Sequence, residues 1–127
     1  RQLYSGGASE ARVNQAKASL EQAKLSSQKA RIEVSREIRD AFANYQGNLA
    51  AVDSRMLVLN GAKDSYSITK ELYSFSRISL FEVLSAQEQL FNSGRQLIDS
   101  IVDRAISKYQ LLRITYELQE QLDYFGN

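Results

Sequence analysis

The side chains that could carry out chemistry in this chain are carboxylates, amines, guanidinium groups and hydroxyls. The 127 residues include no histidine and no cysteine, which removes the commonest general base, the commonest metal ligand and every thiolate site. Asp99 and Asp103 are four residues apart and would share a helix face, but this spacing is common on solvated helices. No glycine-rich phosphate loop or nucleophile–base pair accompanies them. We therefore expect no enzyme, no cofactor and no metal.

Charge and hydropathy argue against nucleic-acid binding and against a membrane-spanning helix. Lys and Arg number 16 and Asp and Glu 15, for a formal net charge of +1. The basic residues are interspersed with acidic ones, so we expect no nucleic-acid partner. No apolar run approaches the ~20 residues that a membrane-spanning helix needs, and no basic face favours a helix lying on a membrane surface. The chain begins with Arg1 rather than Met, so we expect a segment of a longer protein.

Two long helical patterns must position these side chains. The chain contains no proline, a residue that costs about 3 kcal/mol inside a helix. We predict an all-α fold with a long helix over residues 8–73, a serine-rich tip over 74–79 and a returning helix over 80–122. Residues 1–7 are predicted as the end of a strand and a turn, and residues 123–127 as a tail. Two long helices with one short break predict a long antiparallel hairpin that is similar to a coiled coil.

Heptad-like stripes suggest what surrounds this hairpin. The main stripe of the first helix comprises Val13, Ala16, Leu20, Ala23, Ser27, Ala30 and Val34, then Phe42, Tyr45, Leu49, Val52, Met56, Leu59 and Tyr66. The eight-residue step from Val34 to Phe42 predicts a register slip near Ile38. A second stripe comprises Ala11, Ala18, Leu25, Ile32, Ala43, Ala50 and Leu57, and apolar doublets recur in the returning helix at 83/84, 90/91, 97/98, 105/106 and 111/112. A helix that is apolar on two faces needs neighbours on both, which favours a barrel wall or bundle.

Several segments together resemble the TolC-type outer-membrane efflux protein family. Residues 3–7 (LYSGG), which lead into an Ala-, Gln- and Lys-rich helix, are similar to its strand-to-helix junction. Residues 73–87 (YSFSRISLFEVLSAQ) are similar to its hairpin tip and the start of its returning helix. Residues 89–93 (QLFNS) and 109–112 (YQLL) match as well. The resemblance covers essentially the whole chain and leans toward the type I protein-secretion branch.

The resemblance implies an architecture, a location and partners. The chain would be the helical hairpin of the second repeat in a trimeric parent, and a segment of its periplasmic α-helical barrel. The parent would be anchored in the outer membrane of a bacterial cell envelope. The implied partners are a periplasmic adaptor, the other copies in the trimer and, indirectly, an inner-membrane transporter.

The resemblance also assigns roles at the tip. The expected adaptor-docking residues are Ser74, Phe75, Ser76, Arg77, Ile78, Ser79 and Leu80; the alternative is a solvated turn. Tyr73 and Glu82 match a tyrosine and an acid near the pore constriction of the family, where three carboxylates would attract cations. A second family acid is replaced by Ser85. Glu82 has a structural alternative as a helix N-terminal carboxylate. The family often has glycine where this chain has Ser76, a departure that counts against an identical turn geometry.

Two functions from different classes follow from the sequence. One is a passive export conduit whose tip docks an adaptor and opens. The other is a generic antiparallel coiled-coil scaffold, or an adaptor hairpin, with no membrane parent. A free hairpin predicts one apolar stripe per helix, so the doubled stripes favour the conduit. We also expect the isolated chain to self-associate, because its second stripe has lost its neighbours.

Overall fold

The computed structural model describes residues 5–126, and these form two α-helices. Helix α1 is Ser5–Ser74 and helix α2 is Leu80–Gly126. The chain divides into two units, Arg1–Glu37 and Ile38–Asn127. In the described range there is no strand, and neither helix has an apolar stretch long enough to cross a bilayer.

The helix ends differ from the predicted boundaries. Ser5, Gly6 and Gly7, predicted as a turn, belong to α1, since glycine costs only about 1 kcal/mol in a helix and does not prevent one. Ser74, predicted within the tip, is the last residue of α1. Helix α2 continues through residues 123–126, which were expected in the tail. The predicted strand end at residues 1–4, and Asn127, lie outside the described residues.

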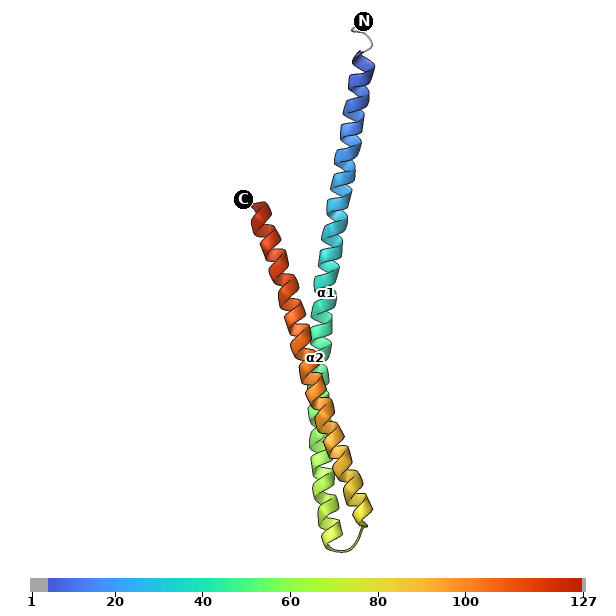
Figure 1. Ribbon diagram of the computed structural model, residues 1–127, viewed down its shortest axis with the longest axis vertical. Helices are drawn as coiled ribbons and strands as arrows, with labels where there is room; N and C mark the ends of the chain where they lie inside the picture. The colour runs from blue at the N-terminus through green and yellow to red at the C-terminus, as the bar shows by residue number, and fades with distance from the viewer. Residues whose placement is uncertain (1–4, 127) are drawn as a thin grey trace. The chain divides into compact units, whose positions relative to one another are not determined.

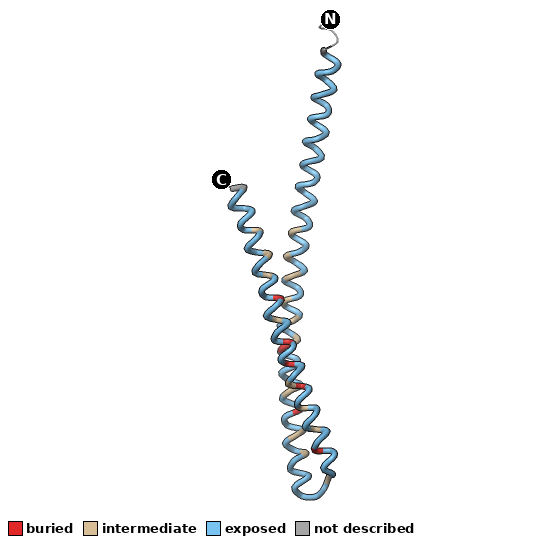
Figure 2. The backbone as a smooth tube through the Cα atoms, viewed as in Figure 1, coloured by how far each residue is buried: buried red, intermediate tan, exposed pale blue. Residues whose placement is uncertain are grey.

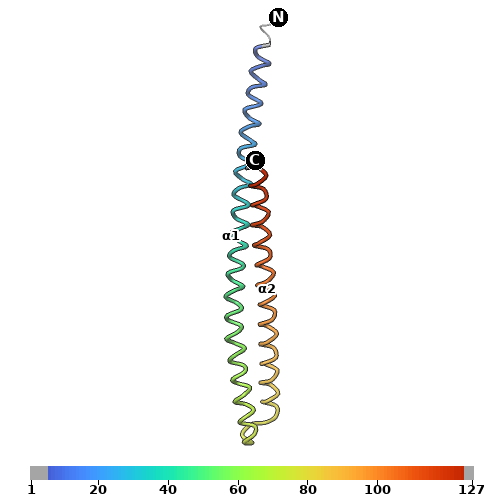
Figure 3. The backbone as a smooth tube through the Cα atoms, turned by 90° about the vertical axis from the view of Figure 1, so that its left-hand side faces the viewer, coloured from blue at the N-terminus to red at the C-terminus, as the bar shows by residue number. Residues whose placement is uncertain are grey.

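The second unit is an antiparallel helical hairpin, which confirms the predicted fold class (Figure 1). From Ile38 onward α1 runs toward the connection at residues 75–79, and α2 returns beside it, as the orthogonal view in Figure 3 also shows. Buried and half-buried residues lie along the facing sides of the two helices (Figure 2). We call the following members of this set the seam: Ile38, Ala41, Tyr45, Asn48, Val52, Leu59, Ala62, Tyr66 and Thr69 of α1, and Val83, Ala86, Leu90, Ser93, Leu97, Ser100, Arg104, Ser107, Leu111 and Ile114 of α2. Apart from the seven-residue step from Val52 to Leu59, its spacings are three and four, as in a coiled coil.

The seam corrects part of the predicted stripe. Phe42, Leu49 and Met56 are exposed and lie beside the seam, not in it. The half-buried residues Val34, Ile38, Ala41 and Tyr45 follow one another at steps of four, three and four. The step from Val34 to Phe42 does not follow the seam, because Phe42 is exposed. The register slip near Ile38 stays a prediction, because residues 6–33 are exposed and have no seam register of their own.

Three buried serines form the most regular part of the α2 side. Ser93, Ser100 and Ser107 are seven residues apart, and Ser107, with 2% of its surface exposed, is the most buried residue of the three. Each hydroxyl donates to a carbonyl of its own helix: Ser93 to Gln89 at 2.8 Å, Ser100 to Leu97 at 2.7 Å and Ser107 to Arg104 at 2.9 Å. Burial therefore leaves no hydroxyl unpaired, which removes the main cost of burying a polar group.

Two hydrogen bonds cross the hairpin and define its register. The Asn48 amide donates to the carbonyl of Asp103 at 3.3 Å, and the Arg55 guanidinium donates to the Gln96 side-chain oxygen at 3.0 Å. This register sets the larger α1 side chains against the small α2 side chains, in the pairs Tyr45 with Ser107, Val52 with Ser100, and Leu59 with Ser93. Alternating large and small residues let two helices approach closely at native packing density.

Many apolar residues lie outside the seam. In the first unit, residues 6–33 are all exposed, including Val13, Leu20 and Ile32. In α2, the second members of the apolar doublets are also exposed: Leu84, Phe91, Ile98, Ile106 and Leu112. Only the first members of four doublets enter the seam. The predicted neighbours on a second face stay a prediction.

Candidate functional site at the hairpin tip

A left-handed residue, Ser76, follows the end of helix α1. Ser76 has a φ of 58°, a conformation that glycine adopts freely and that costs other residues about 1–2 kcal/mol. The Ser76 N–H donates to the Tyr73 carbonyl at 2.9 Å, and the Arg77 N–H donates to the Leu72 carbonyl at 3.0 Å. These two bonds make a Schellman motif. Ser76 therefore adopts the conformation suited to the glycine that the resembled family often has there.

Helix α2 begins with a serine cap. The Ser79 hydroxyl accepts from the Glu82 N–H at 3.4 Å, and the Ser79 carbonyl accepts from the same N–H at 3.2 Å. Ser79 and Glu82 have the spacing of a capping box, with Glu82 as the acidic residue of the first turn. Ile78 is half-buried and Val83 is buried, at the two positions of a hydrophobic staple. The serine-rich segment thus consists of the C-terminal cap of α1 followed directly by the N-terminal cap of α2.

The caps present aromatic and aliphatic side chains to solvent. Phe75 is 67% exposed and Phe81 is 76% exposed, while Leu80 and Tyr73 are about half exposed. Of the expected docking residues, Ile78 alone is half-buried, and the others are exposed. Phe81 was not among the predicted tip residues, although it lies beside them in the first turn of α2. The tip therefore presents several exposed apolar side chains on a connection that is capped at both ends.

A shallow hollow lies on the α1 side of the tip. Its lining combines two apolar side chains of α1 with two charged groups and a phenyl ring: Ile68, Glu71, Leu72, Phe75 and Arg77. Arg77 and Leu72 are joined through the backbone bond of the Schellman motif. The Ser74 hydroxyl donates to the Glu71 carbonyl at 2.6 Å and so braces this turn. An apolar side chain with a polar end would fit such a lining.

Tyr73 and Glu82 lie on opposite sides of the connection. Tyr73 is in the last turn of α1, and Glu82 is in the first turn of α2. Both are exposed, and no hydrogen bond joins their side chains in the described part of the chain. Glu82 already occupies a helix start, where the dipole favours a carboxylate. The structural role and the proposed pore role of Glu82 are compatible, because the carboxylate is free to face solvent.

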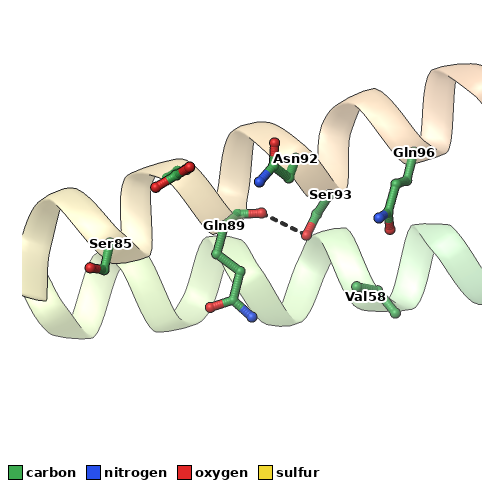
Figure 4. A pocket seen from close by; sticks show the side chains of 7 residues that line it. Val58, Ser85, Gln89, Asn92, Ser93 and Gln96 are labelled. Carbon is green, nitrogen blue, oxygen red and sulfur yellow. Dashed lines mark hydrogen bonds between the residues drawn. The ribbon is translucent and has the colours of Figure 1, made fainter.

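A second hollow lies farther along the hairpin (Figure 4). It is lined mainly by amides and hydroxyls of α2, with one α1 residue: Val58, Ser85, Glu88, Gln89, Asn92, Ser93 and Gln96. The dashed line in Figure 4 is the bond from the Ser93 hydroxyl to the Gln89 carbonyl. Ser85, for which the resemblance predicted a second acid, lines this polar hollow and is not among the lining residues of the tip hollow.

The remaining candidates do not converge on a chemical centre. Asp99 and Asp103 are both exposed, and Asp103 contributes its backbone carbonyl to the bond with Asn48. Within residues 5–126 no three Asp, Glu, His or Cys side chains lie close enough to hold a metal ion. Comparisons with protein-family models, with curated proteins and with solved structures found no match to this chain.

Proposed function

We propose that this chain is the periplasmic helical hairpin of an outer-membrane export channel, and that its tip docks a periplasmic adaptor. In this proposal the parent is a trimer whose helical barrel conducts substrate without chemistry of its own. An inner-membrane transporter supplies the energy through the adaptor. Adaptor docking would bias the closed tips toward an open state, because a ligand shifts a two-state equilibrium by binding one state better.

The observation that carries this proposal is the exposed apolar tip on a doubly capped connection. Phe75, Leu80 and Phe81 are exposed at and beside the connection between the two helices. Exposed aromatic residues held by a rigid backbone are typical of protein docking sites, because little conformational entropy is lost on binding. The capped turn supports the resemblance to the family's tip, since Ser76 adopts a glycine-like φ.

Photo-crosslinking in intact cells would test the docking role. Phe75 in the full-length parent is replaced by a benzophenone derivative of phenylalanine, which has a similar shape. The matched control carries the same group at Leu57, which is 72% exposed on the hairpin shaft. We expect capture of a periplasmic adaptor from residue 75 and not from residue 57. Capture from both positions, or from neither, would contradict tip-specific docking.

The pore role of Glu82 predicts a change in ion selectivity. Glu82→Gln keeps the side-chain size and its place at the helix start but removes three charges from the trimer. We expect the cation preference of the parent in planar bilayers to fall severalfold. Glu88→Gln, at another exposed carboxylate of α2, is the control and should leave selectivity unchanged. Equal selectivity in Glu82→Gln and the unmodified parent would remove Glu82 from the pore.

The alternative function is a coiled-coil scaffold or adaptor hairpin without a membrane parent. The continuous seam between α1 and α2 favours it, because residues 38–126 bury a core without a third helix. Fractionation of the cell envelope separates the two proposals. Recovery of the parent in the outer membrane supports the channel, and recovery only in the soluble fraction supports the scaffold.

A further inference from the structure

The first unit carries an apolar stripe that its own residues do not cover. Val13, Leu20 and Ser27 recur every seven residues, and the alanines 16, 23 and 30 lie between them. All are exposed, and Leu20 has 57% of its surface in solvent. A single helix gains most of its stability from packing an amphipathic face, so this stripe indicates a missing partner.

A basic row runs along one edge of this stripe. Lys17, Lys24 and Arg31 each follow a stripe residue by four positions, so they lie next to it on the helix surface. None of the three forms an ion pair within the described residues. The row is preceded by Glu10. The opposite edge has no net charge, since it comprises Arg12, Ser19, Ser26 and Glu33.

We propose that this stripe binds a partner helix that has its own apolar seam and acidic residues every seven positions along one edge. The alanines 16, 23 and 30 would allow the two backbones to approach closely, as small residues do in packed helices. The acidic edge of the partner would lie along Lys17, Lys24 and Arg31, where edge charges select the partner of a coiled coil. This inference is independent of the export role.

Two other occupants fit the stripe less well. Helix α2 has 47 residues and α1 has 70. Even if every residue of α2 paired with α1, the first turns of α1 would have no α2 residue opposite them. In an antiparallel pair of two copies the basic row would face itself, which is unfavourable. In a parallel pair it would face the opposite edge, where only Glu33 is acidic.

The test uses the full chain and two designed helical peptides. Both peptides share one leucine and alanine seam, and their edge positions carry glutamate in one and lysine in the other. We expect the glutamate peptide to bind about tenfold more tightly at low salt, from three exposed ion pairs, and the difference to shrink at high ionic strength. Anisotropy titrations at two salt concentrations measure both. Equal binding of the two peptides, or no binding of either, overturns the proposal.

Charge reversal in the chain sharpens this test. The triple variant K17E/K24E/R31E should reverse the preference, so that the lysine peptide binds more tightly. The matched control K29E/K63E/K108E has the same change in net charge at exposed positions off the stripe and should keep the original preference. Loss of the preference in the control overturns the proposal, as does concentration-dependent self-association that Leu20→Glu abolishes. Circular dichroism checks that each variant is helical.

Discussion

Residues 6–33 and the seam of residues 38–114 have the same spacing of apolar side chains but opposite burial. In the first region, Leu20 and Ile32 are largely exposed, whereas in the second, Val52 and Leu97 are buried. The burial differs because α2 pairs with the second region, and its side chains cover the seam residues of α1. A heptad pattern therefore indicates that an interface exists, but it does not identify the chain that completes it.

The largest expected contrast is between two leucine substitutions. Leu97→Ala should lower the free energy of unfolding by about 2–3 kcal/mol, because Leu97 is buried in the seam. Leu20→Ala should change it by less than about 0.5 kcal/mol, because Leu20 is exposed. Urea denaturation followed by circular dichroism measures both. Equal losses would mean that the first region is already buried against another chain in solution.

A change in the serine layer should have a smaller effect. Ser100→Leu adds volume where Val52 packs at the same level, so we expect a loss of about 1–3 kcal/mol. Ser100→Ala should be nearly neutral, since the one bond of the Ser100 hydroxyl within the described residues is to the Leu97 carbonyl of its own helix. The same denaturation experiment distinguishes them. A loss for Ser100→Ala as large as that for Ser100→Leu would show that the hydroxyl and not its small size matters.

The smallest expected effect is at the tip, where glycine substitutions at two serines should change the stability of the hairpin in opposite directions. Ser76→Gly should stabilise the hairpin by about 1 kcal/mol, because Ser76 has a positive φ. Ser74→Gly should destabilise it by a similar amount, since Ser74 is helical and its hydroxyl bonds to the Glu71 carbonyl. Thermal unfolding of both variants measures the shift in midpoint. A loss of stability in Ser76→Gly would contradict the strain assigned to that residue.

Sequence reasoning located the hairpin but assigned part of its seam incorrectly. The absence of proline and the helical periodicity were sufficient to predict two long helices and their turn. They were not sufficient to predict the seam residues, because a pattern of apolar residues includes Phe42 and Met56 and leaves out Asn48 and Ser100. Size decides which side chains fit between two close helices, and the buried serines satisfy their own hydroxyls. Neither property is visible in a pattern that counts only apolar residues.

The tip was predictable in position and less so in detail. A serine-rich break and the spacing from Ser79 to Glu82 indicated the turn and the start of α2. The left-handed conformation was not predictable, because serine takes positive φ only where the surrounding structure requires it. Phe81 escaped notice because its exposure depends on the direction in which α2 leaves the cap.

The C-terminal cap of α1 and the N-terminal cap of α2 determine which groups of the tip are available to a binding partner. The carbonyls of Glu71, Leu72 and Tyr73 already accept backbone N–H groups of the connection, and Ser79 already accepts from Glu82. A protein that binds the tip therefore does not have to supply partners for these backbone groups. When it dissociates, none of these groups loses its hydrogen-bond partner. Attachment and release would exchange side-chain contacts alone. If the tip docks a partner as proposed, its backbone would keep the same conformation through repeated binding and release.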